Sequence, residues 1–149
     1  MKKSLFAVLM VIAGVASAAD IGVFAGRNDG SKQDSAGVSV GQSFGKLGVQ
    51  GTFDRGTSGK VDVNRYTASV SYDVVKLGPV QTNVRAGGAF IDTQKPGVSN
   101  GGAAFVGAGI SYPVTKDVAL VADYAYQKGN NLTKAYNGNI VTAGAKYSF

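Results

Sequence analysis

Hydrophobic and polar residues alternate strictly between Asn64 and Tyr72. One face carries Tyr66, Ala68, Val70 and Tyr72, and the other carries Thr67, Ser69, Ser71 and Asp73. Period-two alternation predicts a β-strand whose two faces meet different environments. The polar face is built from small hydroxyls, whereas a water-facing strand would carry long charged side chains. This combination predicts a strand with lipid outside and a narrow lumen inside.

The same pattern recurs along the chain in segments of roughly ten residues, the length of a membrane-spanning strand. Eight such segments are expected, at 20–27, 37–44, 47–54, 64–72, 80–91, 102–112, 117–127 and 141–149. Phe105 breaks the alternation in the sixth segment. Phe24 breaks it in the first, so the pattern leaves the orientation of that segment open.

The connections between these segments alternate in kind. Those after the second, fourth and sixth segments are tight turns, whereas the others, at 28–36, 55–62, 92–101 and 128–137, are longer and polar. Aromatic residues gather near both ends of the segments, as expected of rings that prefer the membrane interface. We therefore predict an all-β fold, an eight-stranded antiparallel up-and-down transmembrane β-barrel. The structural alternative is a soluble lipocalin-type barrel with its apolar face inward, whose outer face would have to be hydrated.

The first residues have the features of a secretory signal peptide. Lys2 and Lys3 precede an uncharged, mostly apolar run, and small residues follow at 16–18. We expect a signal peptide at 1–18, with cleavage after Ala18 or Ala19, and a barrel domain at 19–149. The alternative is a buried N-terminal helix. Loss of the two lysines would leave a mature net charge of 13 − 9 = +4.

Cysteine is absent from the sequence, so no disulfide can order the exported domain. No later run approaches the ~20 apolar residues of a membrane helix, and any membrane embedding must use strands.

Two stretches resemble those of a known family. The terminal residues 145–149, with Tyr147 and Phe149, resemble the C-terminal signal of outer-membrane barrels. Residues 107–120 resemble a strand–turn–strand of the small eight-stranded barrels, the OmpA transmembrane domain and OmpX group. The resemblance implies the bacterial outer membrane and recognition of the last strand by the barrel-assembly machinery. Because the sequence stops at Phe149, it also implies a barrel without the periplasmic domain of full OmpA proteins.

The composition argues against several chemistries. The chain contains no histidine, which removes Ser-His-Asp triads and histidine-ligated metals. We therefore expect no enzyme, no cofactor and no metal site. Nor does the positive charge predict nucleic-acid binding, because it forms no basic stripe.

Inward-facing charges are the first candidate site. Arg85 and Asp123 each lie about six residues from the tight-turn end of their segments, with Asp73 and Lys146 nearer the mouth. These four residues are either a structural ion-pair network that fills the lumen or a constriction that gates ions.

Basic residues in and beside the polar connections are the second candidate site. They form an expected rim of Lys32, Arg55, Lys60, Lys95, Lys128 and Lys134, with Arg27 and Arg65 beside it. Such a rim would suit the phosphates of lipopolysaccharide or an anionic external surface, although ordinary solvated loops explain it equally well. We expect a monomeric structural and surface-interaction protein, and the alternative is a small, low-conductance diffusion channel.

Overall fold

The structure is a computed structural model, and it describes residues 19–58, 61–94 and 100–149. The predicted signal peptide lies outside this range. The described residues form strands β1 Ala19–Asn28, β2 Gln33–Phe44, β3 Leu47–Ser58, β4 Val61–Leu77, β5 Val80–Thr93, β6 Gly101–Pro113, β7 Val118–Gly129 and β8 Gly138–Ser148, with a short 3₁₀ helix, η1 Lys134–Tyr136, before the last strand.

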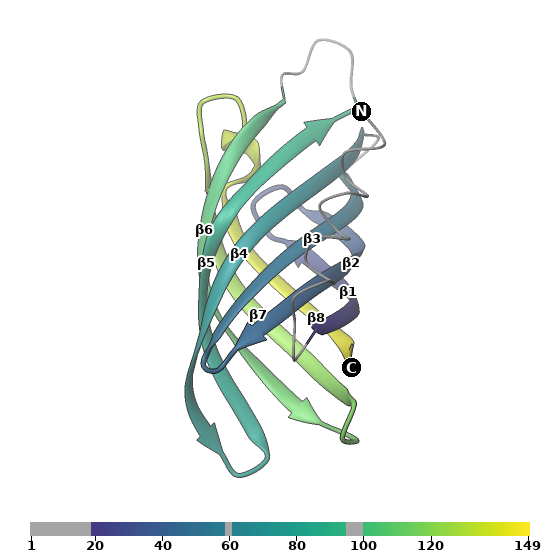
Figure 1. Ribbon diagram of the computed structural model, residues 1–149. Coiled ribbons are helices and arrows are strands. Elements are labelled where there is room, and N and C mark those ends of the chain that lie inside the picture. The colour runs from purple at the N-terminus through teal and green to yellow at the C-terminus, as the bar shows by residue number, and fades with distance from the viewer. Residues whose placement is uncertain (1–18, 59–60, 95–99) are drawn as a thin grey trace.

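The eight strands close into a barrel (Figure 1). Each strand pairs antiparallel with the next, and β1 closes the ring against β8 from Asp20↔Ser148 to Asn28↔Ile140. Closure leaves no open sheet edge, which is what a strand-built protein needs in lipid. The predicted all-β, eight-stranded antiparallel fold is therefore confirmed. Within the described ranges, no helix has the length and apolar character needed to cross a membrane.

The predicted tight turns connect strands at one end of the barrel. Gly45 and Gly78 have φ angles of 64° and 61°, a left-handed conformation that glycine adopts without steric cost. At the third turn the Thr115 hydroxyl accepts a hydrogen bond from the backbone N–H of Val118 at 3.0 Å. We call this end of the barrel the tight-turn end, and the opposite end the loop end.

The two faces of the strands differ as predicted from the alternation. Large apolar side chains of every strand are exposed on the outer wall. Outward rings near the tight-turn end belong to Phe44, Tyr72, Tyr112, Tyr147 and Phe149, and those nearer the loop end to Phe53, Tyr66, Phe90, Tyr124 and Tyr126. Phe24 and Phe105, which break the alternation, both line the lumen.

The strands extend further toward the loop end than predicted, and the connections there are correspondingly shorter. β2 begins at Gln33 and β3 continues to Ser58, both inside stretches predicted to be loops. Backbone pairing continues through these polar residues, for example between Thr57 and Asp62. Their polarity reflects a position beyond the apolar band of the wall rather than a lack of strand partners.

Candidate functional site

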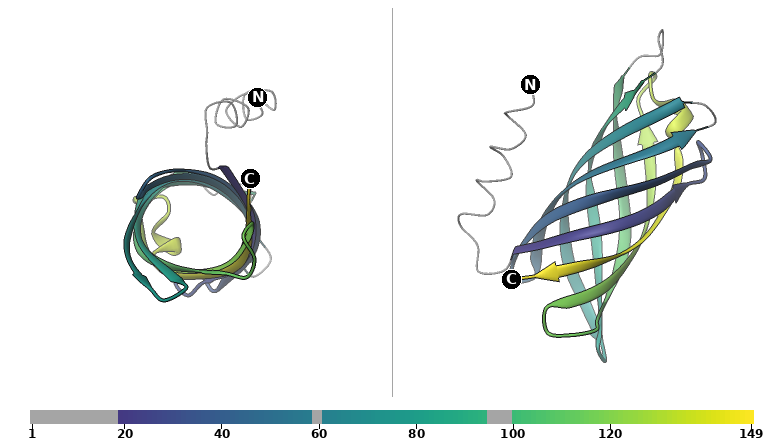
Figure 2. Two further views of the ribbon diagram at one scale, coloured as in Figure 1. Left: turned by 60° about the horizontal axis from the view of Figure 1, so that its bottom comes forward. Right: turned by 90° about the vertical axis from the view of Figure 1, so that its right-hand side faces the viewer.

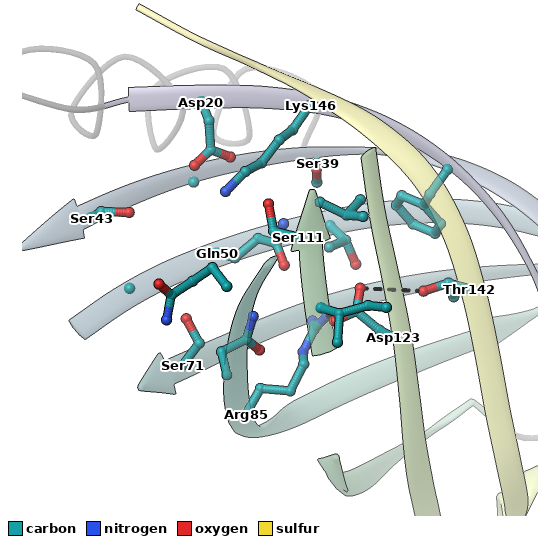
Figure 3. A pocket seen from close by; sticks show the side chains of 18 of the residues that line it. Asp20, Ser39, Ser43, Gln50, Ser71, Arg85, Ser111, Asp123, Thr142 and Lys146 are labelled. Atoms are coloured by element: carbon teal, nitrogen blue, oxygen red, sulfur yellow. Dashed lines mark hydrogen bonds and ion pairs between the residues drawn. The ribbon is translucent and has the colours of Figure 1, made fainter. Parts of the chain in front are cut away.

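Small inward-facing side chains leave a cavity of about 360 Å³ inside the barrel. Its lining begins at the tight-turn end with Lys46, Pro79 and Pro113, and its inner end reaches Arg65 and Gln127. Figure 3 shows the polar and charged side chains that point into it from several strands.

The structure brings Arg85 of β5 and Asp123 of β7 together inside this cavity. Arg85 Nη1 lies 3.1 Å from Asp123 Oδ1, and the two side chains are 14% and 22% exposed. The guanidinium also lies 5.4 Å from the ring centroid of Phe105 and donates to Ser69 Oγ at 3.3 Å. Thr142 Oγ1 donates to the other Asp123 oxygen at 3.5 Å (Figure 3). Arg85 therefore has a carboxylate, a hydroxyl and an aromatic face around it.

A glycine on the strand between them makes room for this pair. Gly109 of β6 faces Asp123 across the ladder, and a Cβ at Gly109 would clash with Asp123 Oδ1. Any larger residue at this position would push the carboxylate away from Arg85.

A second ion pair lies closer to the loop end, and sequence reasoning missed it. Arg65 Nε donates to Asp54 Oδ1 at 2.9 Å, and the side chains are 10% and 1% exposed. The assignment of Arg65 to the loop surroundings is therefore wrong. Its position could have been found from the alternation, because Arg65 shares the parity of Thr67 and Ser69 on the inner face of β4.

The other two residues expected in the lumen lie near its tight-turn end. Asp73 and Lys146 both line the cavity, on β4 and β8 respectively. Figure 3 shows the amino group of Lys146 pointing toward Asp20, which stands on the neighbouring strand β1.

The segment between β7 and β8 enters the loop end of the lumen. Tyr136 of η1 is buried in a small apolar cluster with Val63 and Ile91, and the partly buried Val61 and Ala103 pack against it. The end-on view in Figure 2 shows the short helix inside the ring of strands. We call residues 130–137 the inserted loop.

Polar contacts hold the inserted loop to the wall. The Tyr136 carbonyl accepts hydrogen bonds from the side-chain amides of Asn28 and Gln127, both at 3.0 Å. Thr133, which is 0% exposed, donates through Oγ1 to the Gly102 carbonyl at 2.8 Å. Nothing in the strand periodicity predicts these contacts. The only sequence signal is an aromatic residue within a polar, asparagine-rich connection.

The basic residues expected in loops are distributed differently. Lys60 and Lys95 lie outside the described residues. Arg55 and Lys128 belong to strands β3 and β7, a correction to their placement in loops, whereas Lys32 and Lys134 are exposed in the β1–β2 turn and in η1. Arg55 Nη2 lies 2.6 Å from Asp62 Oδ2, and Arg27 Nη1 lies 3.2 Å from Asp34 Oδ1.

These pairs neutralise part of the rim. Among the described residues, Lys32, Lys128 and Lys134 have no acidic partner at ion-pair distance. In the part of the rim that the structure describes, the unbalanced positive charge therefore lies on the side of the barrel formed by β7, β8, β1 and β2.

The C-terminal aromatic residues lie on the outer wall. The rings of Tyr147 and Phe149 are 5.9 Å apart and both are exposed. The Phe149 N–H donates to the Ala19 carbonyl at 3.1 Å, which ties the chain end to β1. Within the described part of the chain, no group of three or more His, Cys, Asp or Glu residues could hold a metal ion.

No protein-family model matches the sequence, and no curated protein sequence matches it. Solved structures, in contrast, match over nearly the whole barrel. The N-terminal β-barrel domain of Pseudomonas aeruginosa OprF superposes with a TM-score of 0.74 at 19% identity, covering 90% of this chain and 98% of that domain. Neisserial surface protein A, NspA, matches with a TM-score of 0.60 at 23% identity, over 89% of this chain and 95% of its own.

A third match is Ail, the attachment invasion locus protein of Yersinia pestis, in complex with the heparin analogue sucrose octasulfate. Its TM-score is 0.54 at 17% identity, with coverage of 91% of this chain and 100% of Ail. At these identities the similarity shows the fold alone. It confirms the resemblance read from the sequence: the chain has the fold of the small eight-stranded outer-membrane barrels.

Proposed function

We propose that this protein is a structural and surface-interaction barrel of the outer membrane of a Gram-negative bacterium, and that its outer wall contacts lipopolysaccharide phosphates at the loop end. The observation that carries this proposal is the inserted loop, which packs Tyr136 into the mouth of the lumen. A barrel with a filled mouth meets partners through its outer surface. The proposal is of binding and anchoring, not of catalysis.

Strand β7 carries the most suitable arrangement for a phosphorylated lipid. Leu120, Tyr124, Tyr126 and Lys128 follow one another on its exposed face, from the tight-turn end toward the loop end. An apolar side chain, two interfacial rings and a cation therefore follow one another along the direction of the lipid. They match, in the same order, the acyl chains, the sugar region and the phosphate of such a lipid. Lys134 adds a second exposed cation on the same side.

One of the structurally similar proteins supports the proposal of an anionic partner. Ail has a similar fold and has been crystallised with a heparin analogue that carries many sulfates. Small barrels of this architecture can therefore present cations to a polyanion. For this chain the unbalanced lysines on the β7–β8–β1–β2 side are the corresponding candidates.

Export and assembly follow from the same proposal. Cleavage of the signal peptide at 1–18 would release the barrel to the periplasm, and the exposed Tyr147 and Phe149 on the last strand would be read by the barrel-assembly machinery. The expected product is a monomeric barrel in lipid, with no cofactor and no nucleic-acid partner.

Substitution of Lys128 tests the lipopolysaccharide contact. Refolded wild-type protein and Lys128→Gln would be titrated with bisphosphorylated lipid A in detergent and followed by calorimetry. One surface cation near an anionic lipid contributes about 1 kcal/mol, so the affinity of Lys128→Gln should be about fivefold lower. Lys116→Gln is the control, because Lys116 is also exposed but lies in a tight turn at the other end, where its amino group is 3.8 Å from Asp117 Oδ2.

The difference between the two variants should disappear in high salt and with dephosphorylated lipid A, because both conditions remove the electrostatic attraction. Equal affinities of Lys128→Gln and Lys116→Gln for the bisphosphorylated lipid would show that the phosphates are not bound here.

The alternative function, a small diffusion channel, has one observation in its favour. The cavity of about 360 Å³ already extends from the tight-turn end to Arg65. Conduction would require that the inserted loop leave the mouth and that ions pass the inward-facing charges, with Arg85 and Asp123 acting as the gate.

A further inference from the structure

An apolar groove of about 540 Å³ lies on the outer wall of strands β2 to β5. Its floor is formed by Gly51 and Ala68, which face each other in the β3–β4 ladder. Its sides are formed by outward apolar residues of the adjoining positions, Val38, Val40, Val49, Phe53, Tyr66, Val70 and Ala86.

The groove exists because the outer wall carries small residues in the row of Gly51 and Ala68, whereas the neighbouring rows carry large side chains. A Cβ added at Gly51 would find no atom closer than 3.9 Å, so the space above the floor is open. The rings of Phe53 and Tyr66 stand at the edge nearer the loop end, with centroids 5.0 Å apart. The row of small residues continues through Gly88 on β5 to Ala104 on β6, so the floor extends beyond the deepest part of the groove.

The position of the groove identifies the chemistry of its occupant. It lies on the outward face of the strands, between the aromatic residues of the tight-turn end and those of the loop end. In a transmembrane barrel this band of the wall meets hydrocarbon. A long concave surface with an almost wholly apolar lining fits an extended acyl chain.

Arg55 lies beyond the edge of the groove that is nearer the loop end. It stands on the same face of β3, two residues beyond Phe53, and its side chain is 60% exposed. Asp62 accepts from one terminal nitrogen at 2.6 Å. A guanidinium has five N–H donors in a planar fork that matches phosphate, so a second anion can be bound beside Asp62.

A second copy of the barrel fits this surface less well. A two-fold contact places the same patch of each subunit against the other. Here two concave grooves would face each other and leave their floors uncovered. A chain that is itself slender and convex fills the groove without that void.

We propose that the β2–β5 groove binds one acyl chain of a lipid A molecule whose phosphate lies at Arg55. This inference rests on the proposed function in so far as it takes lipid A as the lipid of the facing leaflet. It assigns the acyl chain to a different part of the wall from Lys128, and the two sites can be tested separately.

Filling the groove tests the inference. Wild type, Ala68→Leu and Ala108→Leu would be reconstituted in nanodiscs that contain lipid A, extracted into detergent, and examined by native mass spectrometry for retained lipid. Ala108 is the matched control, because it is an exposed, outward-facing alanine in mid-strand on β6, outside the groove. We expect one lipid A retained by wild type and by Ala108→Leu, and about tenfold lower occupancy in Ala68→Leu.

Three results would overturn the proposal: equal retention by Ala68→Leu and wild type, an equal loss in both leucine variants, or a wild-type dimer that Ala68→Leu converts to monomer. Arg55→Gln should lower retention of bisphosphorylated lipid A but not of the dephosphorylated form, and an equal effect on both would remove Arg55 from the site. Loss of retention in Ala68→Leu together with unchanged affinity in Lys128→Gln would refute the proposed phosphate contact at Lys128 and leave the groove in place. Unchanged retention in Ala68→Leu together with a lower affinity in Lys128→Gln would refute the groove proposal alone.

Discussion

Two ion pairs in the lumen illustrate what the protein does with inward-facing charge. Arg65 and Asp54 lie near the inserted loop, and Arg85 and Asp123 lie further toward the tight-turn end. Burial of one charge alone would be costly, whereas a charge paired at hydrogen-bonding distance is tolerated. The pairs differ in exposure, because Asp54 is almost completely covered and Asp123 borders the cavity. Removal of one partner should therefore lower the free energy of unfolding by different amounts in the two pairs.

We predict that Arg65→Ala destabilises the barrel more than Arg85→Ala does. Removing Arg65 leaves the buried Asp54 carboxylate unpaired, and the free energy of unfolding should fall by about 3–5 kcal/mol. Removing Arg85 leaves the Asp123 carboxylate without its cation beside the cavity, and the free energy of unfolding should fall by about 2 kcal/mol. Equilibrium unfolding in urea, with the protein in lipid vesicles, measures both.

Lys134→Ala is the control for this series, because Lys134 is exposed in η1 and its loss should leave the unfolding free energy unchanged. Unchanged stability in Arg85→Ala would show that its interaction with Asp123 contributes nothing to the folded barrel.

For these residues the sequence predicts the direction of the side chain but not its partner. Period-two parity places Arg85, Asp123 and Arg65 on the inner face, but polarity alone assigned Arg65 to the surroundings of a loop. Phe105 also breaks the expected alternation, and in the structure its ring lies beneath the Arg85 guanidinium. Which charge meets which partner depends on the register of four strands, and a single strand's pattern does not contain that information.

Among the elements, the inserted loop is the part of the barrel that the sequence did not predict. Strand periodicity shows only a polar connection at 128–137, whereas the structure packs Tyr136 into the mouth and buries Thr133 completely. Its contacts come from Asn28, Gln127 and Gly102, which stand on three different strands. Such long-range contacts are set by barrel closure and not by local preference.

Thr133→Val should loosen the inserted loop selectively. The substitution keeps the shape but removes the hydroxyl that donates to the Gly102 carbonyl. The Gly102 carbonyl keeps its hydrogen bond from the Asn130 N–H, so the loss is that of the hydroxyl's own bonds. It should cost about 1 kcal/mol, which corresponds to about fivefold faster amide hydrogen exchange at Asn130 and Tyr136.

Leu132→Ala, an exposed change in the same loop, provides the comparison and should leave exchange unaltered. Exchange in Thr133→Val that matched wild type would mean that the hydroxyl does not hold the loop in the mouth.

The fold of the whole molecule follows largely from the alternation and spacing of residues. Strand number, order and direction were predicted, because a two-residue period and alternating short and long connections leave few arrangements. The strands nevertheless extend beyond Asp54 and Gly37, the predicted ends of the third and second segments, into residues that look like loop residues. Past the apolar band, polar side chains no longer distinguish a paired strand from a turn, so the sequence underestimates the height of the barrel.

The central claim at this scale is that the barrel is closed at its loop end and acts through its outer surface. The most direct test records single-channel currents from residues 19–149, refolded into planar bilayers, beside a Tyr136→Ala variant. We expect wild-type protein that is demonstrably folded to pass no current, and Tyr136→Ala to show openings as the mouth loses its aromatic filling. Reproducible conductance by the wild type would contradict the claim and make the protein a channel.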